Sequence, residues 1–207
     1  VWITGASSGI GKSVAEKFAS EGWKVAVSAR RKEILDEMSN NKNIFSYPLD
    51  VTKQEQIKNI FKKIINDFGN LDMCIFCSGT YDPKDEQSIN VEKIKNVINV
   101  NFFGVVECVK AVESFFKDKK SGQISIVSSI AGYRGLPNSS GYGPSKAALT
   151  NFTESIYFDF KKFNVKVSVI SPGFIKTPLT DKNRFSMPFL KSPEFAAKKI
   201  YEGLIKN

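Results

Sequence analysis

Short apolar runs alternate with longer amphipathic stretches along this chain of 207 residues. The apolar runs have the length of buried strands, and they predict strands at Val1–Thr4, Lys24–Ser28, Ile44–Tyr47, Met73–Phe76, Gln123–Val127 and Lys166–Ile170. The spacing of apolar positions between them predicts helices at about Ile10–Ser20, Lys32–Met38, Lys53–Phe68, Val91–Lys117 and Pro144–Phe163. This alternation predicts an α/β fold, a doubly wound parallel sheet with helices on both faces.

No repeat, low-complexity tract or interdomain linker divides the chain, so we expect residues 1–207 to form a single domain. Each glycine-rich or polar motif follows a predicted strand. Because ligands of doubly wound sheets bind at the carboxyl ends of the strands, we expect these motifs to meet there. The chain starts inside an apolar strand and stops one helix after Thr177, so we also expect residues to be missing at both ends.

The first predicted strand turns into a helix through Thr4-Gly5-Ala6-Ser7-Ser8-Gly9-Ile10-Gly11. Glycines let the backbone approach a pyrophosphate and the helix N-terminus attracts it, so this turn predicts a phosphate-bearing ligand. One alternative is a P-loop, since Gly11-Lys12-Ser13 is in place, although Ala6 stands where the first glycine belongs and Asp50 is the sole candidate for the magnesium carboxylate. A glycine turn that binds nothing is the other alternative.

The second predicted strand ends in Ser28-Ala29-Arg30-Arg31. Dinucleotide sites that select NAD place an acidic residue near this point, where it accepts a hydrogen bond from the ribose 2′-hydroxyl. No acid is present here, and the planar guanidinium of Arg30 suits a 2′-phosphate instead. We therefore predict NADP(H) in preference to NAD(H), with a surface arginine that caps a helix as the alternative.

A hydroxyl, a phenol and an ammonium group follow the fifth predicted strand, at Ser129, Tyr142 and Lys146. Residues four apart share one helical face, so Tyr142 and Lys146 are expected to point the same way. A nearby cation and the positive end of a helix favour the phenolate of a tyrosine, which is otherwise a poor acid or base at neutral pH. A second pair of this spacing, Tyr157 and Lys161, follows no strand, and we interpret it as surface packing.

Composition narrows the chemistry. The formal charge is +9, but it comes mainly from lysines spread along the helices, and we interpret these lysines as solvated surface. The alternative is that they form a patch that binds an acidic partner. We expect no nucleic-acid binding, because phosphate and base contacts favour clustered arginine. The chain has no histidine, which excludes Ser-His-Asp triads and histidine-ligated metals. A general acid or base working near pH 7 must then be a perturbed Tyr, Lys, Cys or carboxylate.

Cys74 and Cys77 form a Cys-x-x-Cys, but they lie in a buried strand pattern, where residues three apart face opposite sides. We therefore expect neither a redox pair nor a zinc site, and no metal. The sequence shows no signal peptide and no apolar run of about 18 residues, so we expect a cytoplasmic protein without a membrane segment.

Together these residues resemble the short-chain dehydrogenase/reductase superfamily, from Val1 to about Thr177. The glycine turn matches its cofactor turn, and Asp50-Val51 matches its adenine contacts. The segment Pro172-Gly173-Phe174-Ile175-Lys176-Thr177 is similar to the one that contacts the nicotinamide amide. One departure is Phe76-Cys77-Ser78-Gly79, where many members carry Asn-Asn-Ala-Gly, so that backbone contacts alone are expected from this strand end.

The resemblance implies a Rossmann-like fold and hydride transfer between the cofactor and a carbonyl or secondary alcohol. Tyr142 is the implied general acid or base, Lys146 lowers its pKa and holds the nicotinamide ribose, and Ser129 binds the substrate oxygen. Asn101 matches the asparagine that orders a relay water. The expected cofactor contacts are Gly5, Ser7, Ser8, Gly9, Ile10, Gly11, Arg30, Asp50, Val51, Ser78, Gly79, Tyr142, Lys146, Pro172, Gly173, Ile175 and Thr177.

Substrate and partners are less defined by the sequence. We expect residues 177–195 or so to form a lid, and its apolar residues suit a small apolar substrate. The alternative is that these residues serve simple packing. They are Leu179, Phe185, Met187, Pro188, Phe189, Leu190 and Phe195. Alternative functions are a 3-ketoacyl thioester reductase and a catalytically silent dinucleotide sensor. In the family, the helices after Val91 and Pro144 pair between subunits, and their many phenylalanines here predict a homodimer or homotetramer.

Overall fold

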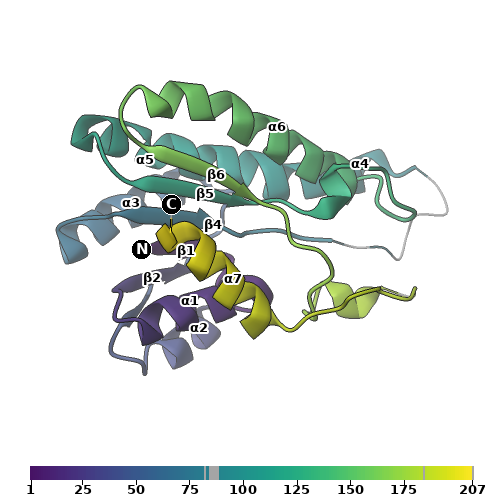
Figure 1. The fold of residues 1–207 in the computed structure, drawn as a ribbon, viewed down its shortest axis with the longest axis horizontal. Helices are drawn as coiled ribbons and strands as arrows, with labels where there is room; N and C mark the ends of the chain where they lie inside the picture. Colours follow the sequence, from purple (N-terminus) through teal and green to yellow (C-terminus); the bar gives the residue numbers. More distant parts are fainter. Residues whose placement is uncertain (82, 84–88, 184, 207) are drawn as a thin grey trace.

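The computed structural model describes residues 1–81, 83, 89–183 and 185–206 and contains a six-stranded parallel sheet (Figure 1). Its strands are β1 Trp2–Thr4, β2 Val25–Ser28, β3 Ile44–Ser46, β4 Met73–Phe76, β5 Gln123–Val127 and β6 Lys166–Ile170. They lie side by side in the order β3-β2-β1-β4-β5-β6. The order reverses between β1 and β4, which is where doubly wound sheets bind ligands, and the predicted fold class is confirmed.

Helices cover both faces of the sheet. On one face lie α1 Gly9–Ser20, α2 Lys32–Met38 and α7 Pro193–Lys206, and on the other lie α3 Gln54–Phe68, α5 Gly104–Lys119 and α6 Tyr142–Lys161, with α4 Val91–Ile98 beside α6 (Figure 1). Short 3-10 turns occupy Ile130–Gly132 (η3) and Thr180–Lys182 (η4). The loops that follow the strands lie between these two layers at one end of the sheet.

The strands bury both of their faces. In β1, Trp2 packs into the core beneath α3, α5 and α6, while the next residue, Ile3, packs into the core beneath α1, α2 and α7. Cys74 and Ile75 divide between the two cores in the same way. This alternation explains why the strands appear in the sequence as continuous apolar runs.

The predicted single helix from Val91 to Lys117 is wrong in its middle. A π-helical turn, η2 Asn99–Phe103, separates α4 from α5. Asn101 in this turn is fully buried. The next residue after the turn, Gly104, packs closely against Val51, because a Cβ added to Gly104 would lie 2.8 Å from Cγ2 of Val51. The periodicity of apolar residues does not reveal this π-helical turn, because the helices before and after it each have a regular apolar pattern of their own. Single π-helical turns inside α-helices are frequent at functional sites.

Helix α6 begins at Tyr142, two residues before the predicted start at Pro144. Pro144 fits within the first helical turn, where its missing N–H is not needed. Tyr142 therefore lies in the first turn of the helix, at the end of the sheet where the strands have their carboxyl ends.

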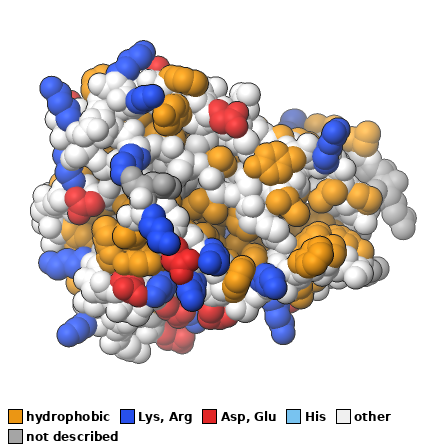
Figure 2. Space-filling model, viewed as in Figure 1, with side chains coloured by type: hydrophobic (Ala, Val, Ile, Leu, Met, Phe, Trp, Pro, Cys, Tyr) orange, Lys and Arg blue, Asp and Glu red, His pale blue; other side chains and the backbone are white. Residues whose placement is uncertain are grey.

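The surface carries mixed charge. On the face shown in Figure 2, basic side chains are spread out and stand among acidic ones. Many lysines pair with carboxylates three or four residues away on their own helix, as Lys58 does with Glu55, and such exposed pairs contribute only a few tenths of a kcal/mol each. No helix in the described ranges is both long enough and apolar enough to cross a membrane.

The turn into β5 offers a test of packing. Gly122 has a φ of +126°, and an added Cβ would lie 2.4 Å from the fully buried ring of Phe116. We expect Gly122→Ala to lower the free energy of unfolding by roughly 3 kcal/mol, from left-handed strain and overpacking together. Gly69 is the matched control, because it also has a positive φ, +73°, but nothing within 4 Å. Urea unfolding should show a loss of only about 1 kcal/mol for Gly69→Ala, and equal losses would contradict the packing argument.

Candidate active site

The glycine turn is held by close backbone contacts with the end of β4. Gly5 has a φ of +68°, and a Cβ there would lie 2.7 Å from the carbonyl oxygen of Cys77. A Cβ on Gly11 would lie 2.4 Å from the carbonyl oxygen of Gly5. Helix α1 starts at Gly9 with no acidic residue in its first turn. The turn is therefore a tight backbone cradle at a helix N-terminus, which attracts anions.

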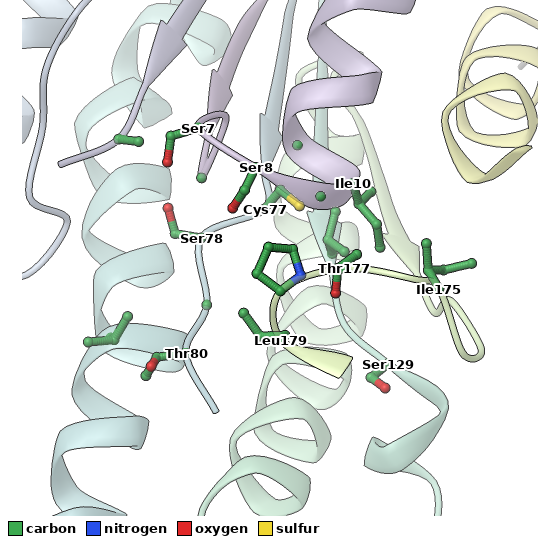
Figure 3. A pocket seen from close by; sticks show the side chains of 18 of the residues that line it. Ser7, Ser8, Ile10, Cys77, Ser78, Thr80, Ser129, Ile175, Thr177 and Leu179 are labelled. Carbon is green, nitrogen blue, oxygen red and sulfur yellow. The ribbon is translucent and has the colours of Figure 1, made fainter. Parts of the chain in front are cut away.

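A cleft of about 420 Å³ runs from this cradle along the carboxyl ends of the strands (Figure 3). Every residue expected to contact the cofactor lines it, as do Ser129, Tyr142 and Lys146. In Figure 3 Thr177 lies near Ile10 at the glycine turn, and a Cβ on Gly9 would lie 2.9 Å from Cγ2 of Thr177. The structure thus brings together residues from the loops after β1, β2, β3, β4, β5 and β6.

Two arginines stand at the β2 end of the cleft. Arg30 and Arg31 both line it, and the guanidinium of Arg31 donates to the hydroxyl of Ser7, at 2.9 Å from Nη2 and 3.1 Å from Nε, and to the Ser7 carbonyl at 3.1 Å. The contact of Arg31 with the glycine turn was not predicted, because it depends on how the loops after β1 and β2 pack together.

Asp50 lies close to these arginines in the cleft lining. Partial burial raises the pKa of Asp50, but hydrogen bonds from Thr52, together with the positive charge of Arg30, outweigh it and hold the pKa below its usual value. Asp50 is therefore an anion whose oxygen already accepts hydrogen bonds from the backbone and hydroxyl of Thr52, at 2.9 and 2.8 Å.

Ser129, Tyr142 and Lys146 converge at the β5 end of the cleft. The side chain of Ser129 hydrogen-bonds the phenol of Tyr142. The ammonium of Lys146 lies 5.7 Å from the centre of the Tyr142 ring and donates to the backbone carbonyl of Val127 at 2.8 Å. Of the two Tyr-x-x-x-Lys pairs, this one lines the cleft, with Lys146 buried and Tyr142 partly buried, whereas Tyr157 and Lys161 are exposed.

The pKa of Tyr142 is raised in this arrangement, and its lowering by Lys146 remains a prediction. Burial raises the pKa of Tyr142, and the hydrogen bond with Ser129 only partly opposes that rise. Burial also lowers the pKa of Lys146 to about 8, so the ammonium is poised to lose its proton just above neutral pH. The physical reason is that burial disfavours the charged form of each group, which raises the pKa of a tyrosine and lowers the pKa of a lysine.

Asn101 lies behind the cleft and does not line it. Its amide accepts from the backbone N–H of Thr80 at 2.7 Å and donates to the Thr80 carbonyl at 3.0 Å. The amide also donates to the hydroxyl of Ser145 at 3.0 Å, and Ser145 donates to the backbone carbonyl of Tyr142 at 2.7 Å. Asn101 and Ser145 therefore tie the loop after β4 to the first turn of α6. The sequence gave no signal for Ser145.

The departure at Cys77 is compensated locally. The thiol of Cys77 accepts a hydrogen bond from the backbone N–H of Gly11, so this strand end still supports the glycine turn through a side chain. Burial raises the pKa of Cys77 to about 11, and it also raises the pKa of Cys74 and of Cys108. All three are free thiols rather than thiolates, and no group of three or more metal-ligating side chains occurs among the residues that the structure describes.

Most of the apolar residues expected in the lid do not line the cleft, so the structure gives little support to an apolar wall there. Of its seven apolar residues, only Leu179 lines the cleft; Phe185 is 45% exposed and Phe189 is 89% exposed. Phe195 belongs to α7. The residues of this segment that do line the cleft beyond Leu179 are Thr180 and Lys182 on the 3-10 turn η4. Periodicity did not reveal this, because the segment is mostly irregular.

The lining fits a nicotinamide dinucleotide. The cradle that a Cβ at Gly5 or Gly11 would fill gives backbone access for a pyrophosphate. Arg30 and Arg31 provide positive charge at the β2 end of the cleft, and Ser129 with Tyr142 provides hydroxyl groups at the opposite end. A nucleoside triphosphate with magnesium is less favoured, because Asp50, the one carboxylate among the lining residues that the structure describes, lies near Arg30.

Comparison with known proteins points the same way. The short chain dehydrogenase family model matches residues 1–187. An uncharacterized oxidoreductase of Myxococcus xanthus is 31% identical over 99% of this chain and 83% of its own length. The 3-oxoacyl-acyl-carrier-protein reductase FabG of Thermotoga maritima is 33% identical over 87% of this chain and 75% of its own. The solved structure of ElxO with NADP bound has a TM-score of 0.89 and 30% identity, covering 97% of this chain and 89% of ElxO.

Burial of Lys146 predicts a pH signature. Its pKa is about 8 in the fold against an ordinary value of 10.5, so between these values the unfolded chain binds a proton that the folded chain has lost. Stability from this group therefore rises with pH. Relative to Lys146→Met, the free energy of unfolding of the wild type should climb by about 1.4 kcal/mol per pH unit between pH 8 and 10.

Denaturant unfolding at several pH values measures this slope, and the buried thiols cancel in the comparison because both proteins contain them. Lys161→Met, in the exposed pair, controls for the loss of one positive charge. Parallel curves for the wild type and Lys146→Met would contradict the burial of a titrating ammonium.

Proposed function

The chain belongs to the short-chain dehydrogenase family of oxidoreductases, and on that basis we propose that it interconverts a carbonyl and a secondary alcohol with NADP(H). The observation that carries the proposal is the convergence of Ser129, Tyr142 and Lys146 in one cleft with the glycine cradle. The bound nicotinamide would supply or accept the hydride. A silent dinucleotide sensor has no need of this hydroxyl, phenol and ammonium set, which argues against that alternative.

Each side chain has a role that its contacts support. Tyr142 protonates the carbonyl oxygen in reduction and takes the proton from the alcohol in the reverse direction, and its raised pKa keeps it protonated for the first of these tasks. Ser129, hydrogen-bonded to that phenol, donates to the same oxygen. Lys146 holds the cofactor ribose and, when protonated, stabilises the phenolate.

Asn101 acts from behind the cleft. Its amide is used by Thr80 and Ser145, so in this proposal it shapes the site by fixing two loops. The relay water expected from the resemblance must then be ordered by other atoms of the π-helical turn. This makes Asn101 a positioning residue.

A 3-oxoacyl thioester is the second candidate substrate. It is favoured by the similarity to FabG of Thermotoga maritima and by a lysine-rich surface that suits an acidic carrier. We also propose a homo-oligomer formed through α5 and α6, because aromatic side chains at their surface remain exposed, with Phe103 before α5 54% exposed and Phe158 on α6 66% exposed. Residues 1–207 would form one cofactor-binding unit within each subunit.

Removal of the phenolic hydroxyl tests the mechanism. Tyr142→Phe should lower kcat by about 10²-fold or more, because it removes the group proposed to transfer the proton to the carbonyl oxygen. NADPH should still bind, since the ring and its packing remain. Turnover is measured by loss of NADPH absorbance and binding by calorimetry, with the exposed Tyr157→Phe as the matched control. Retained turnover in Tyr142→Phe would exclude the proposed role.

Charge reversal at the β2 end tests cofactor choice. Arg30→Asp should reduce the ratio of NADPH to NADH efficiency by at least about tenfold, because it replaces a donor for the 2′-phosphate with an acceptor for the 2′-hydroxyl. Arg134→Asp, at an exposed arginine outside the cleft, makes the same change of charge and should leave the ratio unaltered. An unchanged ratio of NADPH to NADH efficiency in Arg30→Asp would show that Arg30 does not bind the 2′-phosphate.

A further inference from the structure

The substrate end of the cleft is polar on its lid side. Once the exposed phenylalanines are set aside, the lid residues that face the cleft beyond Pro178 are Leu179, Thr180 and Lys182. The hydroxyl of Thr180 already donates to the carbonyl of Ile175 at 2.7 Å, so among these three residues the ammonium of Lys182 is the polar group available to a ligand.

Lys182 is placed close to the proposed reacting groups by Tyr81. Its ammonium donates to the backbone carbonyl of Tyr81 at 2.7 Å, reaching from η4 across to the loop after β4. The ring of the same Tyr81 packs against the ring of Tyr142, with centroids 5.1 Å apart, and its hydroxyl donates to the carbonyl of Asn138 at 3.2 Å. One residue thus contacts both Lys182 and Tyr142, so that the ammonium and the phenol border the same end of the cleft.

The charges of the lining are unevenly distributed. Among the lining residues that the structure describes, the cations are Arg30, Arg31, Lys146 and Lys182, and the one carboxylate is Asp50, at the far end near Arg30. Lys146 donates a hydrogen bond to the backbone carbonyl of Val127. Lys182 carries three donors, it donates to the neutral carbonyl of Tyr81, and its side chain is exposed enough to turn toward a ligand.

From this arrangement we propose that the substrate is an anionic carbonyl compound, an oxo acid, and that Lys182 is the specificity-determining residue that binds its carboxylate while Tyr142 and Ser129 bind its carbonyl oxygen. The proposal deepens the proposed function and depends on it. An ammonium–carboxylate hydrogen bond orients the substrate, since it fixes one end while the reacting carbonyl meets the phenol at the other.

Matched pairs of acids and esters test it. Wild type with NADPH is assayed on pyruvate, acetoacetate and levulinate, which carry the carboxylate at increasing distance from the ketone, and on the methyl ester of each. We expect at least one acid to be preferred over its ester. In Lys182→Met the KM for that acid should rise by about tenfold, with kcat and the constants for the ester nearly unchanged, because only the charged hydrogen bond is lost.

Two further variants separate specificity from structure. Lys182→Arg should recover most of the preference for the acid. Lys191→Met, at an exposed lysine of the segment 177–195 that does not line the cleft, should behave as the wild type. Equal effects of Lys182→Met on acid and ester, no effect on either, or a wild type that prefers the esters or an acyl thioester would overturn the proposal.

Failure of the proposed function gives a different result. If no carbonyl compound is turned over, the oxidoreductase proposal fails, and the anion site is judged by binding alone. Ligand-observed NMR with the NADPH-loaded protein then compares butyrate with butyramide. Saturation transfer to butyrate that is lost in Lys182→Met supports the anion site, and equal transfer to both compounds in the wild type overturns it.

Discussion

The site depends on the close approach of two backbones, the glycine turn after β1 and the strand end after β4. Gly5 stands against the Cys77 carbonyl, and Gly11 against the carbonyl of Gly5, at distances that leave no room for a Cβ. The Cys77 thiol adds a hydrogen bond to the N–H of Gly11. Because β1 and β4 are neighbours at the point where the strand order reverses, this contact places the helix N-terminus of α1 over the cleft and sets the position of the remaining loops.

Burial then gives the site its acid–base character. Desolvation keeps Tyr142 protonated and lowers the pKa of Lys146, so the two side chains do not form a phenolate–ammonium ion pair in this structure. Two hydroxyls, one amide and a backbone carbonyl hold these side chains in place: Ser129 on the phenol, Asn101 through Ser145 on the backbone of Tyr142, and Val127 on the ammonium. The chemistry that we propose therefore draws on hydrogen bonds from β5 and the loop after it, from the π-helical turn η2 and from the first turn of α6.

The two ends of the cleft differ in the way they present positive charge. At the β2 end, Arg31 is braced on Ser7, and Asp50 balances the charge of Arg30, which suits recognition of a phosphate at a fixed place. At the opposite end, Lys182 is exposed and rests on a backbone carbonyl, which suits a ligand that enters and leaves. This asymmetry is the basis for assigning one end to a cofactor and the other to an anionic substrate.

The sequence alone was sufficient for the sheet, the strands and the lining of the cofactor cleft, because apolar runs, glycines at a strand end and a Tyr-x-x-x-Lys after another strand end each have a local physical meaning. It did not reveal the π-helical turn at Asn101, the hydrogen bond of Arg31 with Ser7, or the link of Tyr81 to Lys182, which joins residues 101 positions apart. It did not reveal that burial raises the Tyr142 pKa, or that most apolar residues of the segment 177–195 lie outside the cleft lining. Burial and side-chain direction decide those features, and both arise only when distant loops pack together.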